Sequence, residues 1–334
     1  MRIVYMGTPD IAAVILERLL EGPDEVVLAV TQPDRPKGRG KELACSPVKA
    51  LAVSRGIPVF TPEKLRLPEN VEVIREANPD MIVVAAFGQI LPKSVLDIPK
   101  YGCINVHASL LPKYRGAAPI QWSILDGESE TGVTIMYMNE GLDTGDILLQ
   151  KIVPIADDET GGSLHDKLAE VGAEALMEAI PQIVDGTLAA VPQGEMTTPY
   201  AKQLTKDMGM LDFTWDAAKL ARYVRGLSPW PGTYTYRDGQ MLKIWKAEAV
   251  PAGCGADCGA EDPGDSRDSA SQNAGVVAEV RTGDFSVQTG DGWLRVTEVQ
   301  PEGKRRMSAA DYLRGYAVKA GTKLGKATVD SEEV

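Results

Sequence analysis

Histidine is scarce in this sequence, and so are the features that place a chain in a membrane or in an oxidising compartment. Only two of the 334 residues are histidines, His107 and His165. No run of about 20 apolar residues is present, so a membrane-spanning helix is not expected. The four cysteines are too few and too scattered for a disulfide framework. The chain opens on a strand-like segment rather than a signal peptide, and we therefore expect a cytoplasmic protein.

Several common cofactor motifs are also absent. The strand-like residues 2–6 lead into the turn 7–10, which lacks the G-x-G-x-x-G pattern, and no P-loop occurs anywhere. A dinucleotide is therefore not expected there, and we interpret 7–10 as a structural turn. Cys254 and Cys258 form a C-x3-C pair without a second Cys or His pair nearby in sequence, so we expect no metal site.

Strand-like and helix-like segments alternate over the first 186 residues. Apolar runs typical of strands occupy residues 2–6, 26–31, 57–60, 81–86, 103–107, 133–138 and 146–155. Helical spacing occupies residues 11–20, 47–55, 70–77, 117–125 and 163–184, the last with Ser163 as its expected N-cap. Residues 33–41 are expected to form a polar loop. The alternation predicts an α/β fold with a doubly wound, mostly parallel sheet.

The pattern changes after Gly186. Residues 187–201 are polar and are predicted to be a linker. Beyond them, strand-like pieces at 233–237, 241–248, 275–281, 285–288 and 293–300, with helices at 217–225 and 308–319, predict a small β-barrel. Residues 251–274 are rich in Gly, Ala, Ser and Asp and are predicted to be a flexible insert. The predicted domains are therefore 1–186 and 202–330, joined by the linker 187–201.

Asn105 and His107 stand at the end of the predicted strand 103–107. Because they are two residues apart, their side chains point to the same face of that strand. Open α/β sheets bind ligands at the carboxyl ends of their parallel strands. His107 is therefore either a catalytic imidazole or a core histidine with satisfied hydrogen bonds, and the residues alone leave both alternatives open. His165 falls in the first turn of the helix 163–184 and is interpreted as a surface residue.

A loop bracketed by glycines, residues 141–146, supplies a carboxylate that can approach this histidine. It contains Asp143 and Asp146, and chemistry alone does not choose between them. Asn, His and Asp together suit attack on a carbonyl carbon. The amide donates to the developing oxyanion, the imidazole donates or shuttles a proton, and the carboxylate orients the imidazole or accepts a proton through water. No G-x-S-x-G nucleophile elbow is present, so we expect the substrate itself to be the nucleophile.

Basic residues gather in two places although the chain is acidic overall. With 47 acidic and 35 basic residues the net charge is −12, which argues against non-specific coating of nucleic acid but does not exclude a local basic surface. The first gathering is Arg35, Lys37, Arg39 and Lys41. The second is Lys304, Arg305, Arg306, Arg314, Lys319, Lys323 and Lys326. Both are candidates for phosphate contact, and the alternative is ordinary solvated charge.

These segments resemble the methionyl-tRNA formyltransferase family over nearly the whole chain. The resemblance lies in residues 31–41, 103–112, 115–121, 130–135, 141–146, 229–231, 243–247 and 307–309. It implies a Rossmann-like formyltransferase domain followed by an oligonucleotide-binding-type barrel that contacts tRNA. The basic loop and the second domain belong to the tRNA enzymes, whereas the His-x-Ser-Leu-Leu-Pro element and the Asp loop are shared by all formyl-tetrahydrofolate transferases. The insert 251–274 is longer and more acidic than the family pattern.

The resemblance implies transfer of the formyl group of 10-formyltetrahydrofolate to the α-amine of methionine on initiator tRNA. Asn105, His107 and Asp143 match the family's catalytic trio. The residues that match its folate-contacting turn are Ser109, Leu110, Leu111 and Pro112. The residues that match the segment inserted at the acceptor stem of the tRNA are Arg35, Lys37, Arg39 and Lys41.

Three rival functions are weighed against this one. A formyl-folate transferase acting on a sugar nucleotide or a purine precursor shares the catalytic trio but lacks the basic loop and barrel. A formyl-folate hydrolase uses water as acceptor and needs no tRNA-binding domain. A non-enzymatic RNA-binding module would have lost one of the trio, and all three residues are present. No exposed apolar helix face stands out, so we expect a monomer without membrane attachment.

Overall fold

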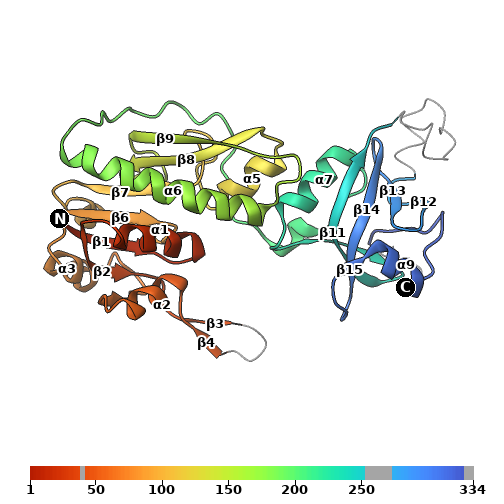
Figure 1. Cartoon of the computed structure of the whole chain (residues 1–334), viewed down its shortest axis with the longest axis horizontal. Coiled ribbons are helices and arrows are strands. Elements are labelled where there is room, and N and C mark those ends of the chain that lie inside the picture. Colours follow the sequence, from red (N-terminus) through yellow and green to blue (C-terminus); the bar gives the residue numbers. More distant parts are fainter. Residues whose placement is uncertain (38–41, 253–272, 327–334) are drawn as a thin grey trace, which may run out of the picture. The chain divides into compact units, whose positions relative to one another are not determined.

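The computed structural model describes residues 1–37, 42–252 and 273–326 (Figure 1). The chain forms two compact units. The first comprises Met1–Ile120, Ser129–Ile155 and Ser163–Lys202, and the second comprises Gln121–Glu128, Ala156–Gly162 and Gln203–Val334. The predicted linker 187–201 packs with the first unit. Within the described residues no helix is long and apolar enough to cross a bilayer.

The first unit is built on a seven-stranded sheet. In spatial order its strands are β5 (Val59–Phe60), β2 (Glu25–Val30), β1 (Arg2–Gly7), β6 (Met81–Ala85), β7 (Cys103–His107), β8 (Glu130–Tyr137) and β9 (Ile147–Pro154). The strands from β5 to β7 are parallel, whereas β8 and β9 each pair antiparallel with their neighbours. The predicted doubly wound, mostly parallel sheet is confirmed.

Helices cover both faces of this sheet. They are α1 (Asp10–Leu20), α2 (Pro47–Ser54), α3 (Pro68–Glu76), α4 (Lys93–Leu96) and α6 (Gly161–Val184). Helix α5 (Pro119–Leu125) belongs to the second unit from Gln121 onward. Successive side chains of β1 point to opposite faces of the sheet and pack against different helices. The Tyr5 hydroxyl donates to the carbonyl of Ala12 in α1, whereas Val4 packs in a cluster with Ile74 of α3. After the exposed Arg2, the residues of β1 are all buried, as a strand covered on both faces requires.

Several boundaries in this unit differ from the sequence-based prediction, two of them at predicted features. Helix α6 begins at Gly161, so Ser163 is not its N-cap. A Cβ on Gly161 would lie 2.4 Å from the carbonyl oxygen of Gly226, so glycine is required where these two backbones approach at the first turn of α6. The polar loop 33–41 is also partly wrong, since Arg35–Lys37 is strand β3 and pairs antiparallel with β4 (Glu42–Ala44). The four-residue helix α4 is too short to leave a periodic signal.

The second unit is built on an antiparallel sheet, with helices and a 3-10 turn beside it. The strand path is β10 (Thr233–Arg237), β11 (Gln240–Val250), β14 (Trp293–Pro301), β13 (Phe285–Gln288) and β12 (Val277–Val280), with β15 (Met307–Ser308) paired to β14. The other elements are η1 (Lys206–Gly209), α7 (Ala217–Gly226) and α9 (Ala309–Gly315). Helix α9 ends at Gly315 rather than at residue 319, because Tyr316 is extended.

The segment 321–325 connects the two outermost strands of this sheet. Its Gly321 N–H donates to the carbonyl of Val277 in β12 at 2.8 Å. Its Gly325 N–H donates to the carbonyl of Tyr236 in β10 at 3.0 Å. Since both edge strands use this segment as a partner, the sheet closes on itself as the predicted small barrel. Most of the predicted insert 251–274 lies outside the described residues.

Candidate active site

Asn105 and His107 occupy the carboxyl end of β7, where the sequence placed them. Asn105 pairs with Met136 of β8 and His107 with Thr134, so both side chains lie on one face of the sheet. The two residues are 7% and 6% exposed. The Asn105 amide makes no hydrogen bond within the described residues. An amide that no protein group uses is available to a ligand.

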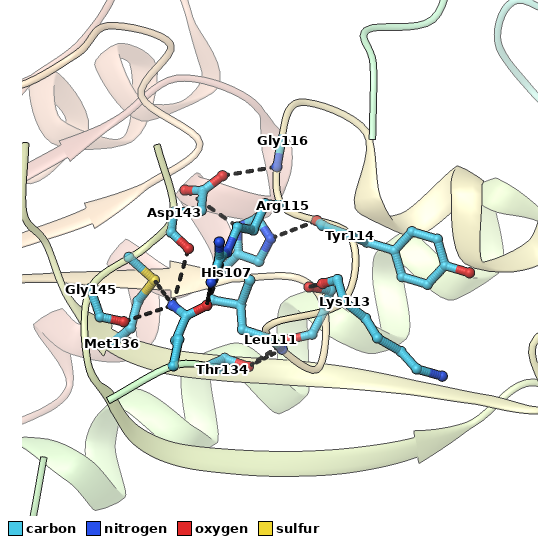
Figure 2. Close-up of polar contacts among 12 residues, drawn as sticks. His107, Leu111, Lys113, Tyr114, Arg115, Gly116, Thr134, Met136, Asp143 and Gly145 are labelled. Atoms are coloured by element: carbon cyan, nitrogen blue, oxygen red, sulfur yellow. Dashed lines mark hydrogen bonds and ion pairs between the residues drawn. The ribbon is translucent and has the colours of Figure 1, made fainter. Parts of the chain in front are cut away.

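His107 lies between a backbone carbonyl and a carboxylate (Figure 2). Its Nε2 atom is 3.1 Å from the carbonyl oxygen of Tyr114, and its Nδ1 atom is 3.9 Å from Oδ1 of Asp143. A carbonyl only accepts, so Nε2 carries a hydrogen and donates it. Nδ1 is consequently the ring nitrogen that faces the carboxylate of Asp143. The histidine is therefore held in one orientation rather than being an isolated core residue.

Asp143 is held in place by two glycine-dependent turns. Its own φ is +53°, a left-handed conformation, and its Oδ2 accepts a 2.9 Å hydrogen bond from the N–H of Gly116. A Cβ on Gly145 would lie 1.8 Å from the carbonyl oxygen of Tyr137, so only glycine fits there. Asp146 is used differently: its carbonyl accepts from the Tyr137 N–H, and its carboxylate makes no hydrogen bond within the described residues. The structure thus brings Asp143 to the histidine.

Tyr200 covers the turn that holds Asp143. A Cβ on Gly116 would come within 2.7 Å of both the Tyr200 ring and the carbonyl oxygen of Ala201, so this glycine lets two segments approach closely. Burial, with a smaller contribution from the charge of Asp143, raises the pKa of Tyr200. Tyr200 therefore stays a neutral phenol beside the carboxylate.

The turn 109–112 is fixed by the side chain of Thr134. The Thr134 hydroxyl accepts from the N–H of Leu111 at 3.1 Å and donates to the carbonyl of Ser109 at 2.6 Å. Gln150 donates to both Thr134 Oγ1 and the carbonyl of Leu111. The Ser109 hydroxyl donates to the carbonyl of Lys113 within the same turn. Ser109 and Leu111 are buried, whereas Leu110 and Pro112 are partly exposed.

Sequence reasoning missed Thr134 and Gln150. They lie on strands β8 and β9, and both face a turn far away in the sequence. Other polar residues stand on the same strands, so residue type alone did not single these two out. Their partners depend on the antiparallel register of these strands, which the sequence did not reveal.

The structure describes only part of the basic loop. Arg35 is exposed at the start of β3, and Asp34 beside it forms a 2.6 Å ion pair with Lys49. The side chain of Lys37, together with Arg39 and Lys41, lies outside the described residues. In the second unit, Arg306 pairs with Glu298 at 2.5 Å and lies 4.9 Å from the centre of the Trp245 ring.

The remaining candidate residues are placed as follows. His165 lies in α6 and pairs with Asp166 at 3.0 Å, so its ring is partnered outside the site. Among the described residues no three His, Cys, Asp or Glu side chains are arranged to hold a metal ion. The pair Cys254 and Cys258 lies outside the described residues.

Comparisons with known proteins assign both units of the chain. Residues 1–180 match the formyl transferase family, and residues 203–317 match the formyl transferase C-terminal domain. A methionyl-tRNA formyltransferase of Citrifermentans bemidjiense is 49% identical over 98% of this chain and 97% of its own length. One from Agathobacter rectalis is 47% identical over 96% of this chain and 99% of its own. The chain belongs to the methionyl-tRNA formyltransferase family.

Solved structures share the fold of this formyltransferase at low sequence identity. The sugar 3N-formyl transferase WlaRD, solved with dTDP and 5-N-formyl-THF, is 19% identical with a TM-score of 0.62, covering 91% of this chain and 99% of its own. HypX from Aquifex aeolicus, in complex with tetrahydrofolic acid, is 18% identical with a TM-score of 0.56, covering 94% of this chain and 47% of its own. These likenesses support the fold of the formyltransferase units.

Proposed function

We propose that this protein transfers the formyl group of 10-formyltetrahydrofolate to the α-amine of methionine on initiator tRNA, giving N-formylmethionyl-tRNA. The observation that carries the proposal is that both units match this family while Asn105, His107 and Asp143 meet at the end of β7. The products are tetrahydrofolate and the formylated aminoacyl-tRNA. The amine loses one proton, and the departing N10 of the folate gains one.

Asp143 acts on the attacking amine. An α-amine has a pKa near ~8, so a substantial share is protonated at neutral pH and must lose a proton before it attacks. The Asp143 carboxylate is oriented by the Gly116 N–H through one oxygen, and its other oxygen faces the imidazole. We assign it the role of taking the proton, directly or through water, and of stabilising protonated His107.

Asn105 and His107 stabilise the oxygen of the formyl group. As the amine adds, this oxygen gains negative charge, and preorganised donors lower the barrier. Because His107 Nε2 is used by the Tyr114 carbonyl, Nδ1 is the atom that we assign to the oxyanion. The amide of Asn105 is the second donor, and its lack of a protein partner supports this role.

We assign the folate contact to the turn formed by Ser109, Leu110, Leu111 and Pro112. The internal hydrogen bonds of Ser109 and Leu111 make the turn rigid, and this supports a role in orientation. The contacts to folate then fall mainly to the side chains of Leu110 and Pro112 and to the backbone. The partly exposed apolar surface of these two residues suits an aromatic ring system.

We assign the acceptor stem of the tRNA to Arg35, Lys37, Arg39 and Lys41. In a chain of net charge −12, attraction to a polyanion depends on local groups of cations, and these four form the densest group in the catalytic unit. The barrel of the second unit supplies the remaining tRNA contacts. We also propose that the enzyme acts as a monomer in the cytoplasm, where initiator tRNA is charged and used.

One experiment tests the proposal against its rivals. Purified protein is given 10-formyltetrahydrofolate and, in parallel, methionyl initiator tRNA, methionyl elongator tRNA, a dTDP-amino sugar or no acceptor. The expected result is rapid formylation of the initiator tRNA, with little product from the other acceptors and little release of formate. Preferential formylation of the amino sugar, or formate release that no acceptor suppresses, would contradict the proposal.

A further inference from the structure

The side-chain amide of Gln193 connects three backbone segments of the site. Its Nε2 donates to the carbonyl of Asp143 at 3.0 Å and to the carbonyl of Gly145 at 2.6 Å. Its Oε1 accepts from Nε and from a terminal nitrogen of Arg115, at 3.1 and 2.8 Å. Both polar atoms of one half-buried side chain are thus used, and apart from a 3.9 Å contact of Nε2 with the sulfur of Met136 in β8, the partners belong to the two loops that surround the carboxylate of Asp143.

The orientation of this amide follows from its partners. Arginine has only donors, so it pairs with the oxygen, and carbonyls only accept, so they pair with the nitrogen. Reversing the amide would place two donors against two donors and two acceptors against two acceptors. The network therefore permits one arrangement, which favours a defined position for the Asp143 loop.

We propose that Gln193 is a positioning residue for catalysis: it fixes the backbone of Asp143 so that the carboxylate meets His107. This inference rests on the proposed function, because it concerns the step assigned to Asp143. Asp143 has a left-handed backbone, a conformation that a non-glycine residue adopts only with surrounding support. Gln193 supplies that support from the backbone side, while the Gly116 N–H holds the carboxylate itself.

The segment around Gln193 has other anchors, so its place does not depend on this one residue. Val191 exchanges two backbone hydrogen bonds with Ile147 at 2.8 Å. Further along, the Thr198 hydroxyl accepts from the Tyr114 N–H at 2.7 Å, and the Ala201 N–H donates to the carbonyl of Arg115. A change at Gln193 therefore loosens the Asp143 loop while the segment stays attached.

Two substitutions separate the donor from the acceptor. Gln193→Met keeps the length of the side chain and removes its hydrogen bonds to Arg115 and to the carbonyls of Asp143 and Gly145. Gln193→Glu keeps an acceptor for Arg115 but turns the donor into a second acceptor facing two carbonyls. We expect both variants to lose about 10–100-fold in kcat, because small displacements of a catalytic group are costly, with the KM for the folate donor changed less than about threefold.

The control is Gln203→Met, the same substitution at an exposed glutamine that makes no side-chain hydrogen bond within the described residues. It should retain the kcat of the unchanged protein. Melting temperatures of all variants should stay within about 4 °C of one another, since the lost hydrogen bonds are partly exposed. The rate of backbone amide hydrogen exchange in residues 141–146 should rise in Gln193→Met and stay unchanged in the control.

A double-mutant cycle tests whether Gln193 acts through Asp143. In single-turnover formylation, Gln193→Met should lower the rate little further once Asp143→Asn is present. The inference is overturned if Gln193→Met lowers the rate by the same factor with and without Asp143→Asn. It is also overturned if Gln193→Glu keeps full activity. The inference is also overturned if the amide hydrogen-exchange rates of residues 141–146 in Gln193→Met equal those of the unchanged protein. This measurement does not depend on activity. If instead the unchanged protein fails to formylate initiator tRNA, the proposed function fails, and the exchange result still decides the role of Gln193.

Discussion

The Nδ1 atom of His107 faces Oδ1 of Asp143 at 3.9 Å. This separation is too long for a direct hydrogen bond, and it leaves room for a small group between the ring nitrogen and the carboxylate. An amine N–H or a water molecule beside the two atoms can reach each of them at about 2.8 Å. The pair is therefore arranged to share a proton with a third group, as the attack of an amine on a formyl carbon requires.

Loss of either oxyanion donor should reduce turnover far more than tRNA affinity. We expect His107→Ala and Asn105→Ala each to lower kcat by about 10²–10³-fold, the usual effect of removing one such donor. Steady-state formylation measures kcat, and filter binding measures the tRNA affinity. His165→Ala, which alters the only other histidine, serves as the control and should keep full turnover. Either site variant with half of normal turnover would remove that residue from the catalytic role.

The two aspartates of the Gly-bracketed loop should differ sharply. Asp143→Asn removes the proton acceptor and the charge that faces His107, so we expect a loss of turnover comparable to that of His107→Ala. Asp146→Asn should be mild, because the backbone carbonyl of Asp146 rather than its carboxylate is used in the fold. Rates are compared at equal tRNA saturation across the acidic range, where protonation of the attacking amine lowers activity. Equal losses in the two variants would undo the assignment.

Thr134 and Thr131 offer a matched pair on one strand. Both are buried on β8, but Thr134 holds the turn 109–112, whereas the Thr131 hydroxyl has no hydrogen-bond partner. Thr134→Val should cost about 1–3 kcal/mol of unfolding free energy and raise the KM for the folate donor several-fold. Thr131→Val should be neutral or slightly stabilising, since no bond is lost. Urea unfolding and donor titrations measure both, and similar behaviour of the pair would contradict the role of Thr134.

The basic loop should govern the salt dependence of tRNA use. Each lost phosphate contact reduces the salt slope of binding by about one unit, so Arg39→Ala with Lys41→Ala should weaken tRNA use and flatten the slope without affecting formyl-folate binding. Formylation is measured against tRNA concentration at about 50 and about 200 mM salt. The control is Lys64→Ala with Arg66→Ala, an exposed pair elsewhere in the catalytic unit. A normal slope in the loop variant means that these cations are only solvated charge.

Cys103 should resist thiol reagents, because burial raises its pKa from the ordinary 9.0 to about 12. At about pH 8 only about one thiol in ten thousand is then ionised, and the thiolate is the reactive form. The unfolded chain ionises this thiol first, so stability should fall as the pH rises from about 9 toward about 12. Peptide mass analysis after brief alkylation should find the exposed Cys45 labelled and Cys103 intact. Equal labelling of the two would contradict the burial of Cys103.

The sequence by itself determined the class of fold and one half of the site. Alternating apolar segments predict a parallel sheet because each element must bury a face, and this signal is local. The two-residue spacing of Asn105 and His107 placed both side chains on one face of β7, which the register with β8 confirms. The glycines around Asp143 also carried local information, since their turns admit no side chain.

Only the tertiary structure decided how the other half of the site is assembled. The distance between His107 and Asp143 depends on where a distant loop returns to β7, and the Gly116 N–H that orients Asp143 comes from yet another turn. Gln193 lies in a polar stretch without periodicity, so nothing in its neighbourhood in the sequence indicated its partners. The closure of the second sheet by residues 321–325 is equally non-local. Such contacts join segments far apart in the chain, and their geometry exists only once the whole unit has folded.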